Sequence, residues 1–304
     1  SCFQPRSSCL QPQQVQIVRV VEMKPVDPPK NVEQPKLEVK PDPEPEKWAT
    51  IKGRIVWDQG KYGNSPKRVP IVATKDIEVT KKDDGFYFED WVVNETTMGI
   101  HNVVVWILPE PTLEVEIAGL KKAMEDSKSY KFTSFQPSDI HPQLRVPAPI
   151  ARMEIPALRF DPHVVAAREG QNLVIRNHAP VPQNPKWVSR YDDELDFLLP
   201  AGGTRTIPNL KAERFPIEIS CSIHPWMKAY VRVFDHPYFA VTDFNGNFEI
   251  KDIPRLKGKV RMFIWQENGL HRGAAGRFGQ TVELKLGMTD LKEIKFDTAS
   301  RPKK

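Results

Sequence analysis

Residues 214–235 read RFPIEISCSIHPWMKAYVRVFD, and this stretch decides the fold. Apolar and polar residues alternate before Cys221 and again after Met227, with the period of two that half-buried β-strands show. The segment between these two alternations is short and has a proline directly after His224. The pattern therefore predicts two strands joined by a loop at one end of a β-sandwich.

The loop carries side chains that bind soft metal ions. Cys221 offers a thiolate, His224 an imidazole and Met227 a thioether, all within seven residues. Blue-copper sites use such a set, completed by a second histidine. The alternative is a free buried cysteine beside an unrelated surface histidine and methionine. Trp226, in the same loop, is either an exposed docking residue or a structural plug.

Outward from this loop, short apolar runs alternate with turn signals. HVVAAREGQNLVIRN (163–177) and DFLLPAGGTRTIP (196–208) contain Gly-rich turns between apolar alternations. ATIKGRIVWD (49–58) alternates over Ile51, Ile55 and Trp57, whereas GIHNVVVWILPEP (99–111) is a nearly continuous apolar run. The alternating runs favour half-buried strands, and the continuous run favours a strand at the centre of a sheet. YFAVTDFNGNFEIKDIP (238–254) places the hairpin signal FNGN between two strands.

These patterns predict an all-β protein of serial β-sandwich modules with one short helix. The 304 residues are enough for two or three small domains. We expect a β-rich module over 48–146, a sandwich over 147–234 and a third β-module over 235–304. The helix is expected near 113–127, inside the first module, because apolar residues recur there at helical spacing. Those residues are Leu113, Ile117, Leu120 and Met124.

The N-terminal segment, residues 1–47, has a different composition. Its second half (24–47) alternates proline with lysine, glutamate and aspartate and holds few large apolar side chains. Such a segment buries too little surface to fold and tends to an extended form, so we expect a stalk or a solvated tail. Cys2 is a candidate for lipid attachment, for a disulfide with Cys9, or for no special role. The chain begins at Ser1 without methionine, as a processed exported protein would.

Composition argues against several classes of function. The net charge of +5 comes from interleaved acidic and basic residues, which argues against a nucleic-acid-binding surface. The sequence holds no run of 18 apolar residues and none of the motifs GxSxG, GxxxxGK[ST], GxGxxG or HExxH. We therefore expect no enzyme. The histidines outside the loop stand singly, and His163 is expected to be either exposed or packed.

The loop CSIHPWM resembles the copper loop of amicyanin-type cupredoxins, in which proline also follows the histidine. A longer stretch, 221–254, together with KGRIVWD (52–58), GIHNVVVWI (99–107) and VRMFIWQE (260–267), is similar to bacterial envelope proteins labelled methylamine-utilisation or plastocyanin-like. In those proteins a cupredoxin module precedes a small carboxypeptidase-regulatory-like β-sandwich. The resemblance implies a cupredoxin-like Greek-key sandwich over 147–234 and a regulatory-like sandwich over 235–304.

The resemblance also implies a copper site with one ligand missing. It assigns Cys221, His224 and Met227 as ligands. In cupredoxins the first ligand is the histidine of a Pro-His-Asn sequence, but this chain has Pro-Gln-Asn, with Gln183 at the ligand position. An amide is a poorer donor to copper than an imidazole. His178 lies five residues earlier and is a weak substitute.

Two functional hypotheses follow from the resemblance. The first is a non-enzymatic structural or interaction subunit of the bacterial periplasm, envelope or surface, with an incomplete type 1 copper site. It implies other envelope proteins as partners in a larger assembly, no nucleic acid, and contact with a membrane only through an N-terminal lipid anchor. The alternative is a mononuclear copper electron-transfer protein that uses Cys221, His224 and Met227. The implied cofactor is copper, or none.

Overall fold

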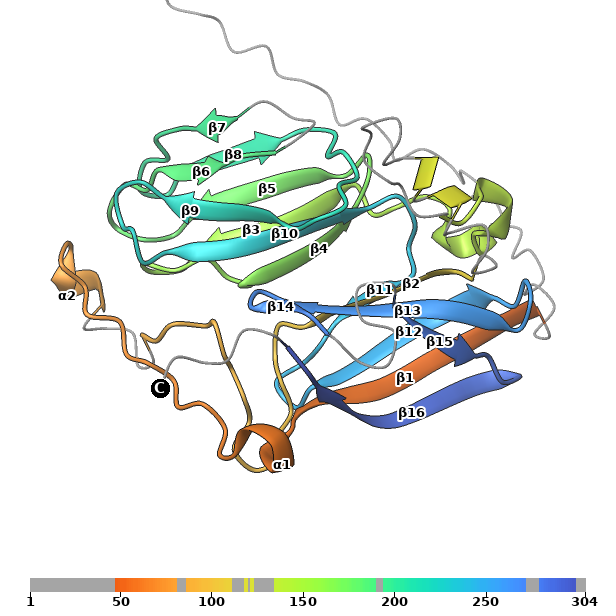
Figure 1. The fold of residues 1–304 in the computed structure, drawn as a ribbon. Helices are drawn as coiled ribbons and strands as arrows, with labels where there is room; N and C mark the ends of the chain where they lie inside the picture. The colour runs from red at the N-terminus through yellow and green to blue at the C-terminus, as the bar shows by residue number, and fades with distance from the viewer. Residues whose placement is uncertain are drawn as a thin grey trace, which may run out of the picture. The chain divides into compact units, whose positions relative to one another are not determined.

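β-Strands dominate the parts of the chain that the computed structural model describes (Figure 1). These parts all lie within Asp42–Lys304 and comprise residues 47–80, 86–110, 118–119, 121–122, 134–189, 194–271 and 279–298. The helical elements there are short and include α1 (Gln59–Tyr62), α2 (Ile77–Thr80) and the 3-10 helices Pro137–Asp139 and Pro142–Leu144. The predicted all-β class is confirmed. Within the same residues, no helix has the length and apolar character that crossing a membrane requires.

The strands that precede Ile150 in the sequence and those that follow Phe234 together build one sandwich, here called the outer sandwich. One sheet has the order β12-β1-β16, and the other has the order β11-β2-β13-β14 with β15 paired to β13. The strands are β1 (Trp48–Trp57), β2 (Val104–Pro109), β11 (Phe239–Val241), β12 (Asn247–Pro254), β13 (Lys259–Gln266), β14 (Gly269–Leu270), β15 (Gln280–Glu283) and β16 (Gly287–Phe296). In β1, Ile51, Ile55 and Trp57 are buried, as the alternation predicted.

Strand β2 is buried on both faces, as its continuous apolar sequence predicted. It lies between β11 and β13. Val105 and Ile107 contribute to the core between the two sheets of the outer sandwich. Trp106 belongs to a second cluster on the opposite face, which also contains residues of the middle of the chain. That cluster comprises Val104, Trp106, Leu108, Val164, Phe234, Phe263 and Trp265.

The structure differs from the predicted serial arrangement of the ranges 48–146 and 235–304. β1 pairs antiparallel with β12 and parallel with β16, and β2 pairs antiparallel with β11 and β13. The two ranges therefore share both sheets of one sandwich, with the residues between them inserted. Periodicity indicates which residues form strands, but it does not indicate which strands pair, because a strand can hydrogen-bond to any segment that presents a free edge.

The middle sandwich is built from β3 to β10, between Ile150 and Phe234. Its sheets have the orders β4-β10-β9-β6-β7 and β3-β5-β8. The strands are β3 (Ile150–Ile155), β4 (Val164–Arg168), β5 (Asn172–Asn177), β6 (Pro185–Trp187), β7 (Leu195–Asp196), β8 (Thr204–Ile207), β9 (Ile217–Cys221) and β10 (Lys228–Phe234). Its core is separate from that of the outer sandwich and includes Leu173, Trp187 and Ile219.

The FNGN segment forms a turn but not the predicted hairpin. Gly246 N–H donates to the Asp243 carbonyl at 2.9 Å, and Gly246 has a φ of +78°. The strands on either side, β11 and β12, belong to different sheets of the outer sandwich. The turn thus carries the chain from one sheet to the other. Its sequence specifies the local reversal, whereas the pairing of the flanking strands depends on β1 and β2.

Two sequence predictions fall largely outside the described residues. Of the helix predicted near 113–127, only residues 118–119 and 121–122 are described, and they are helical. The stalk at 1–47 lies outside the described residues except for Lys47, and so do Cys2 and Cys9. The stalk, the lipid anchor and the disulfide stay predictions.

Candidate functional site

The candidate site lies at the end of the middle sandwich where β9 meets β10. β9 ends at Cys221, β10 begins at Lys228, and the two strands are antiparallel, so the predicted loop closes a hairpin. β6 pairs with β9 in a register that sets Pro185 opposite Cys221. This register brings the two residues before β6, Gln183 and Asn184, next to the start of the loop.

Gln183, Cys221 and His224 converge as predicted. The amide oxygen Oε1 of Gln183 lies 3.5 Å from Cys221 Sγ and 2.8 Å from His224 Nδ1. Cys221 Sγ and His224 Nδ1 are 3.8 Å apart. The backbone N–H of Asn184 donates to Cys221 Sγ at 3.4 Å. We call Gln183, Cys221, His224 and Met227 the pole.

All four side chains of the pole are withdrawn from solvent. Gln183 and His224 are 0% exposed, Met227 2% and Cys221 3%. Met227 belongs to the same core cluster as Cys221, and its backbone N–H donates to the His224 carbonyl at 2.9 Å. The pole is therefore a buried polar cluster under the loop, with the Met227 side chain in the core beside it.

His178 does not join the pole. Its side chain is 42% exposed, and its Nε2 lies 2.5 Å from Glu154 Oε2. It follows β5, which belongs to the sheet β3-β5-β8, whereas Cys221 lies in the other sheet. The prediction that His178 is only a weak substitute agrees with this placement, because its imidazole is held on a different part of the rim.

A carboxylate that the sequence analysis did not single out completes the surroundings of His224. Asp76 Oδ2 lies 2.8 Å from His224 Nε2. Asp76 comes from a segment of the outer sandwich, residues 69–80 and 86–90, which we call the strap. It is 148 residues from His224 in sequence, and it stands in no recognisable motif. Only the folded path of the chain brings the two together.

Both ring nitrogens of His224 face oxygen atoms, Nδ1 toward Gln183 and Nε2 toward Asp76. Burial lowers the pKa of His224, but its hydrogen bonds to Cys221 and Asp76 and the charges of these groups raise it above its ordinary value. Burial raises the pKa of Cys221, but the hydrogen bonds from His224 and from the backbone of Asn184 lower it. The arrangement favours a thiolate beside an imidazolium.

The pole fits part of a copper site. A sulfur and a nitrogen that bind one metal ion lie about 3.5–3.9 Å apart, because the bonds to the metal are about 2.3 and 2.0 Å long. The distance of 3.8 Å between Cys221 Sγ and His224 Nδ1 matches this separation. Gln183 does not complete the set, because its amide oxygen binds the nitrogen of His224 that faces Cys221. Its Nε2 is buried without a hydrogen-bond partner. A His-His-Cys plane for cupric ion is therefore not available from these residues.

Among the residues that the structure describes, no group of three or more histidine, cysteine, aspartate or glutamate side chains has an arrangement that holds a metal ion. The donors at the pole are thus Cys221, His224 and Met227, with an amide in place of the second imidazole.

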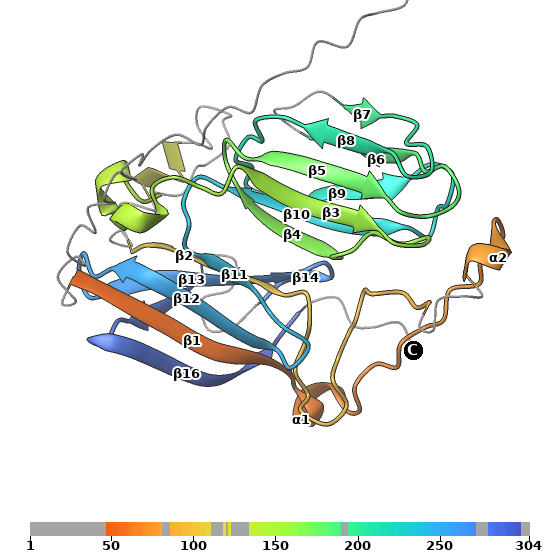
Figure 2. The same ribbon diagram turned by 180° about the vertical axis from the view of Figure 1, so that it is seen from behind.

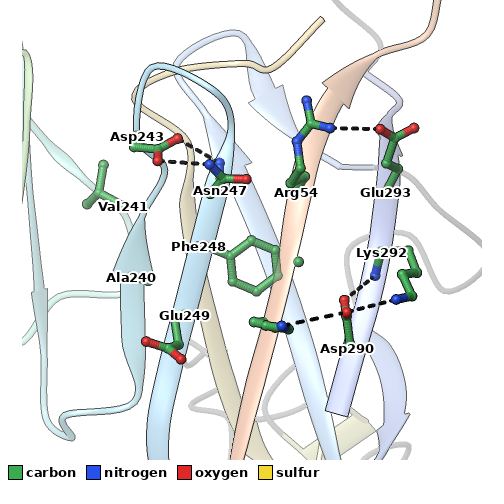
Figure 3. A pocket seen from close by; sticks show the side chains of 12 residues that line it. Arg54, Ala240, Val241, Asp243, Asn247, Phe248, Glu249, Asp290, Lys292 and Glu293 are labelled. Carbon is green, nitrogen blue, oxygen red and sulfur yellow. Dashed lines mark hydrogen bonds and ion pairs between the residues drawn. The ribbon is translucent and has the colours of Figure 1, made fainter. Parts of the chain in front are cut away.

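A second candidate feature is an open groove of about 750 Å³ on the outer sandwich (Figure 3). Its lining comes largely from β1, β12 and β16 and is rich in paired charges. Arg54 Nη1 lies 2.9 Å from Glu293 Oε1, and Lys292 Nζ lies 2.9 Å from Asp290 Oδ2. These charges neutralise each other in pairs, so the groove presents no convergent set of unpaired groups that would select a ligand.

Comparisons with known proteins give structural neighbours only. No family model matches the chain, and no curated protein matches it. A reduced amicyanin variant covers 29% of this chain and 86% of its own length, with 16% identity and a TM-score of 0.26. Amicyanin from Paracoccus versutus (Thiobacillus versutus) covers 29% and 85%, with 20% identity and a TM-score of 0.26. A purple cupredoxin from Nitrosopumilus maritimus covers 28% and 99%, with 20% identity and a TM-score of 0.24.

Proposed function

We propose that this protein is a non-enzymatic, cupredoxin-like structural or interaction subunit with an incomplete type 1 copper site. The observation that carries the proposal is the state of His224. Its side chain is fully buried, and both of its nitrogens are bound by the protein's own groups, Gln183 and Asp76. An imidazole held in this way serves the packing of the fold rather than the exchange of a metal ion.

A cupric centre needs a firm trigonal set of thiolate and two imidazoles. At the pole the third place is taken by the Gln183 amide, which binds the imidazole of His224. Electron exchange also needs a short path from the metal to a partner, and the complete burial of His224 lengthens that path. Both features support a structural role over electron transfer.

The proposed setting is the bacterial periplasm, envelope or surface, in a larger assembly with other envelope proteins. It is supported by the resemblance of the 221–254 stretch and by the proline- and charge-rich sequence 24–47, which would space the sandwiches from an anchor at Cys2. Fractionation and native mass measurement test this setting. Recovery as a cytoplasmic monomer would contradict it.

The alternative, a mononuclear copper electron-transfer protein, is favoured by two features of the same residues. The separation of 3.8 Å between Cys221 and His224 suits a shared metal ion. The N–H of Asn184, donated to Cys221 Sγ, stabilises a thiolate. In this alternative Cys221, His224 and Met227 hold the copper ion, and the Cys221 thiolate would bond strongly to cupric copper.

A titration with cupric ion, followed by absorption spectroscopy, decides between the two. We expect no intense thiolate-to-copper band in the red part of the spectrum for the unmodified protein. The variant Gln183→His should gain such a band, since it supplies the missing imidazole, whereas the matched control Gln183→Asn should not. An intense band in the unmodified protein would overturn the proposal in favour of the alternative.

A further inference from the structure

The strap is a paired loop with its tip at the pole. Its two legs hydrogen-bond to each other, with Ile71 N–H donating to the Phe86 carbonyl at 3.0 Å and Phe88 N–H to the Val69 carbonyl at 2.9 Å. In both ribbon views, α2 near the tip of the strap lies on the same side as the end of β9 (Figures 1 and 2). The leg pairing gives the strap a defined direction away from β1.

Besides the ion pair of Glu89 with His163 at 3.8 Å, three contacts join the strap to the middle sandwich. Asp76 holds His224 Nε2 at 2.8 Å. Val79, in α2, packs against the core cluster that contains Cys221 and Met227. Phe86 meets the ring of Trp226 edge-on, with 6.2 Å between ring centroids. The contacts are of different kinds, one charged, one aliphatic and one aromatic, and they fall on successive parts of the strap.

The surface of the middle sandwich that the strap contacts includes Trp226, whose ring is held in place by a hydrogen bond. Trp226 is half-buried and donates its ring N–H to the Leu158 carbonyl at 3.2 Å, which orients the ring that Phe86 contacts. It is thus a structural plug rather than a freely exposed aromatic side chain. Asp76 contacts Nε2 of His224, and the opposite ring nitrogen, Nδ1, faces Cys221 and Gln183.

We propose that the pole is a socket for the strap and that Asp76 is the residue that positions His224 over Cys221. The chain itself thereby occupies the end of the middle sandwich. A soft metal ion or a thiol-reactive electrophile reaches Cys221 only after the strap has moved. This inference does not depend on the proposed function, because the strap closes the pole whether or not copper binds there.

The test measures how fast Cys221 is alkylated by N-ethylmaleimide in the native full-length protein. Peptide mass mapping separates Cys221 from Cys2 and Cys9. The double variant Asp76→Ala/Phe86→Ala removes the charged and the aromatic contact. Because access requires a local opening, losing these contacts should raise the rate at Cys221 about tenfold or more.

A matched control uses the neighbouring residues of the strap. Lys75 is exposed, and the Tyr87 ring lies under Arg68 at 4.9 Å. The control Lys75→Ala/Tyr87→Ala should leave the rate within about twofold of the unmodified protein, since the contacts to the pole remain. The conservative variant Asp76→Asn keeps an oxygen for His224 Nε2 and should retain most of the protection.

Equal alkylation rates in the unmodified protein and in Asp76→Ala/Phe86→Ala would overturn the inference. So would a rate in the unmodified protein as fast as that in urea-unfolded protein. Circular dichroism of each variant checks that the sandwiches are folded. The copper titration described above reports on the proposed function independently: a blue unmodified protein would overturn that function but leave the strap result standing.

Discussion

The pole and the groove hold charged groups in opposite ways. At the pole, an imidazole without solvent exposure lies between an amide and a carboxylate that come from different parts of the chain. In the groove, Arg54 and Glu293 are 30% and 57% exposed and lie on adjacent strands of one sheet (Figure 3). The imidazole itself has no contact with solvent, whereas both charged groups in the groove are in contact with water.

This difference determines what each cluster contributes. Removing one partner from a buried charged pair leaves the other without solvation, which costs several kcal/mol. An exposed ion pair contributes about 0–1 kcal/mol, because water and salt compensate for its loss. The buried cluster should therefore stabilise the contact between the strap and the middle sandwich by more than the exposed pairs stabilise their sheet.

The largest effect should come from His224→Ala. This variant leaves the Asp76 carboxylate and the Gln183 oxygen without their partner and opens a cavity beside Cys221. We expect a loss of about 3–5 kcal/mol in the free energy of unfolding, measured by urea denaturation of metal-free protein. His178→Ala, at an exposed histidine paired with Glu154, is the control and should cost less than about 1 kcal/mol. Equal losses in the two variants would remove the distinction between buried and exposed clusters.

A second buried histidine extends the comparison to pH. His163 is 6% exposed, with Nε2 at 3.0 Å from Glu267 Oε2 and Nδ1 at 3.8 Å from Glu89 Oε2. Burial lowers its pKa, but the hydrogen bond and charge of Glu267 and the charge of Glu89 raise it above the ordinary value. Asp90 is also near, and Tyr230, whose own pKa is raised and which stays neutral, meets the ring edge-on.

The sign of the pH effect follows from this raised pKa. The folded protein binds the proton of His163 more tightly than the unfolded chain, so the stabilisation is complete below about pH 6.5 and is lost as the pH rises through the folded value. His163→Gln should therefore cost about 2–3 kcal/mol at pH 6 and less at pH 9. Urea denaturation of both proteins across this range is the measurement. A difference that stays constant or grows with pH would contradict the assignment.

The third effect concerns the strap itself. Asp76 is 29% exposed, so water compensates in part for its loss, and Asp76→Ala should lower the free energy of unfolding by about 1–2 kcal/mol. Lys75→Ala, next to it and exposed, should change stability by less than about 0.5 kcal/mol. If both variants match the unmodified protein in urea denaturation, the ion pair to His224 contributes nothing measurable.

The strands and the loop 221–227, which resembles a copper-binding loop, could be predicted from the sequence because their signals are local. The alternation at Ile51 and Ile55, the continuous apolar run of β2 and the convergence of Cys221 with His224 all follow from short stretches of residues. Gln183 beside them followed from the resemblance to the cupredoxin pattern. Each of these predictions depends on only one or two neighbouring strands.

Pairing between distant strands and the partner of His224 were not accessible in this way. β1 pairs with β12 across about 200 residues of chain and with β16 across about 240. Periodicity shows which face of β1 is buried and leaves its neighbours undetermined. Asp76 lies in a segment without a recognisable motif, and its contact with His224 arises from the direction that the strap legs give to the tip. Such contacts are properties of the assembled fold.

The smallest effect should come from the groove. Arg54→Ala removes the ion pair with Glu293 at 2.9 Å, the hydrogen bond to the Asn245 carbonyl and that to the Thr97 carbonyl. Because the side chain is partly exposed, we expect a loss of no more than about 1 kcal/mol, most of it from the backbone hydrogen bonds. Glu293→Gln, which removes only the charge, should cost a few tenths of a kcal/mol at low salt and nothing at about 1 M salt, where ion pairs are screened. Urea denaturation at the two salt concentrations measures both. A loss for Arg54→Ala as large as that for His224→Ala would mean that the exposed cluster stabilises the fold as much as the buried one, which would contradict the comparison.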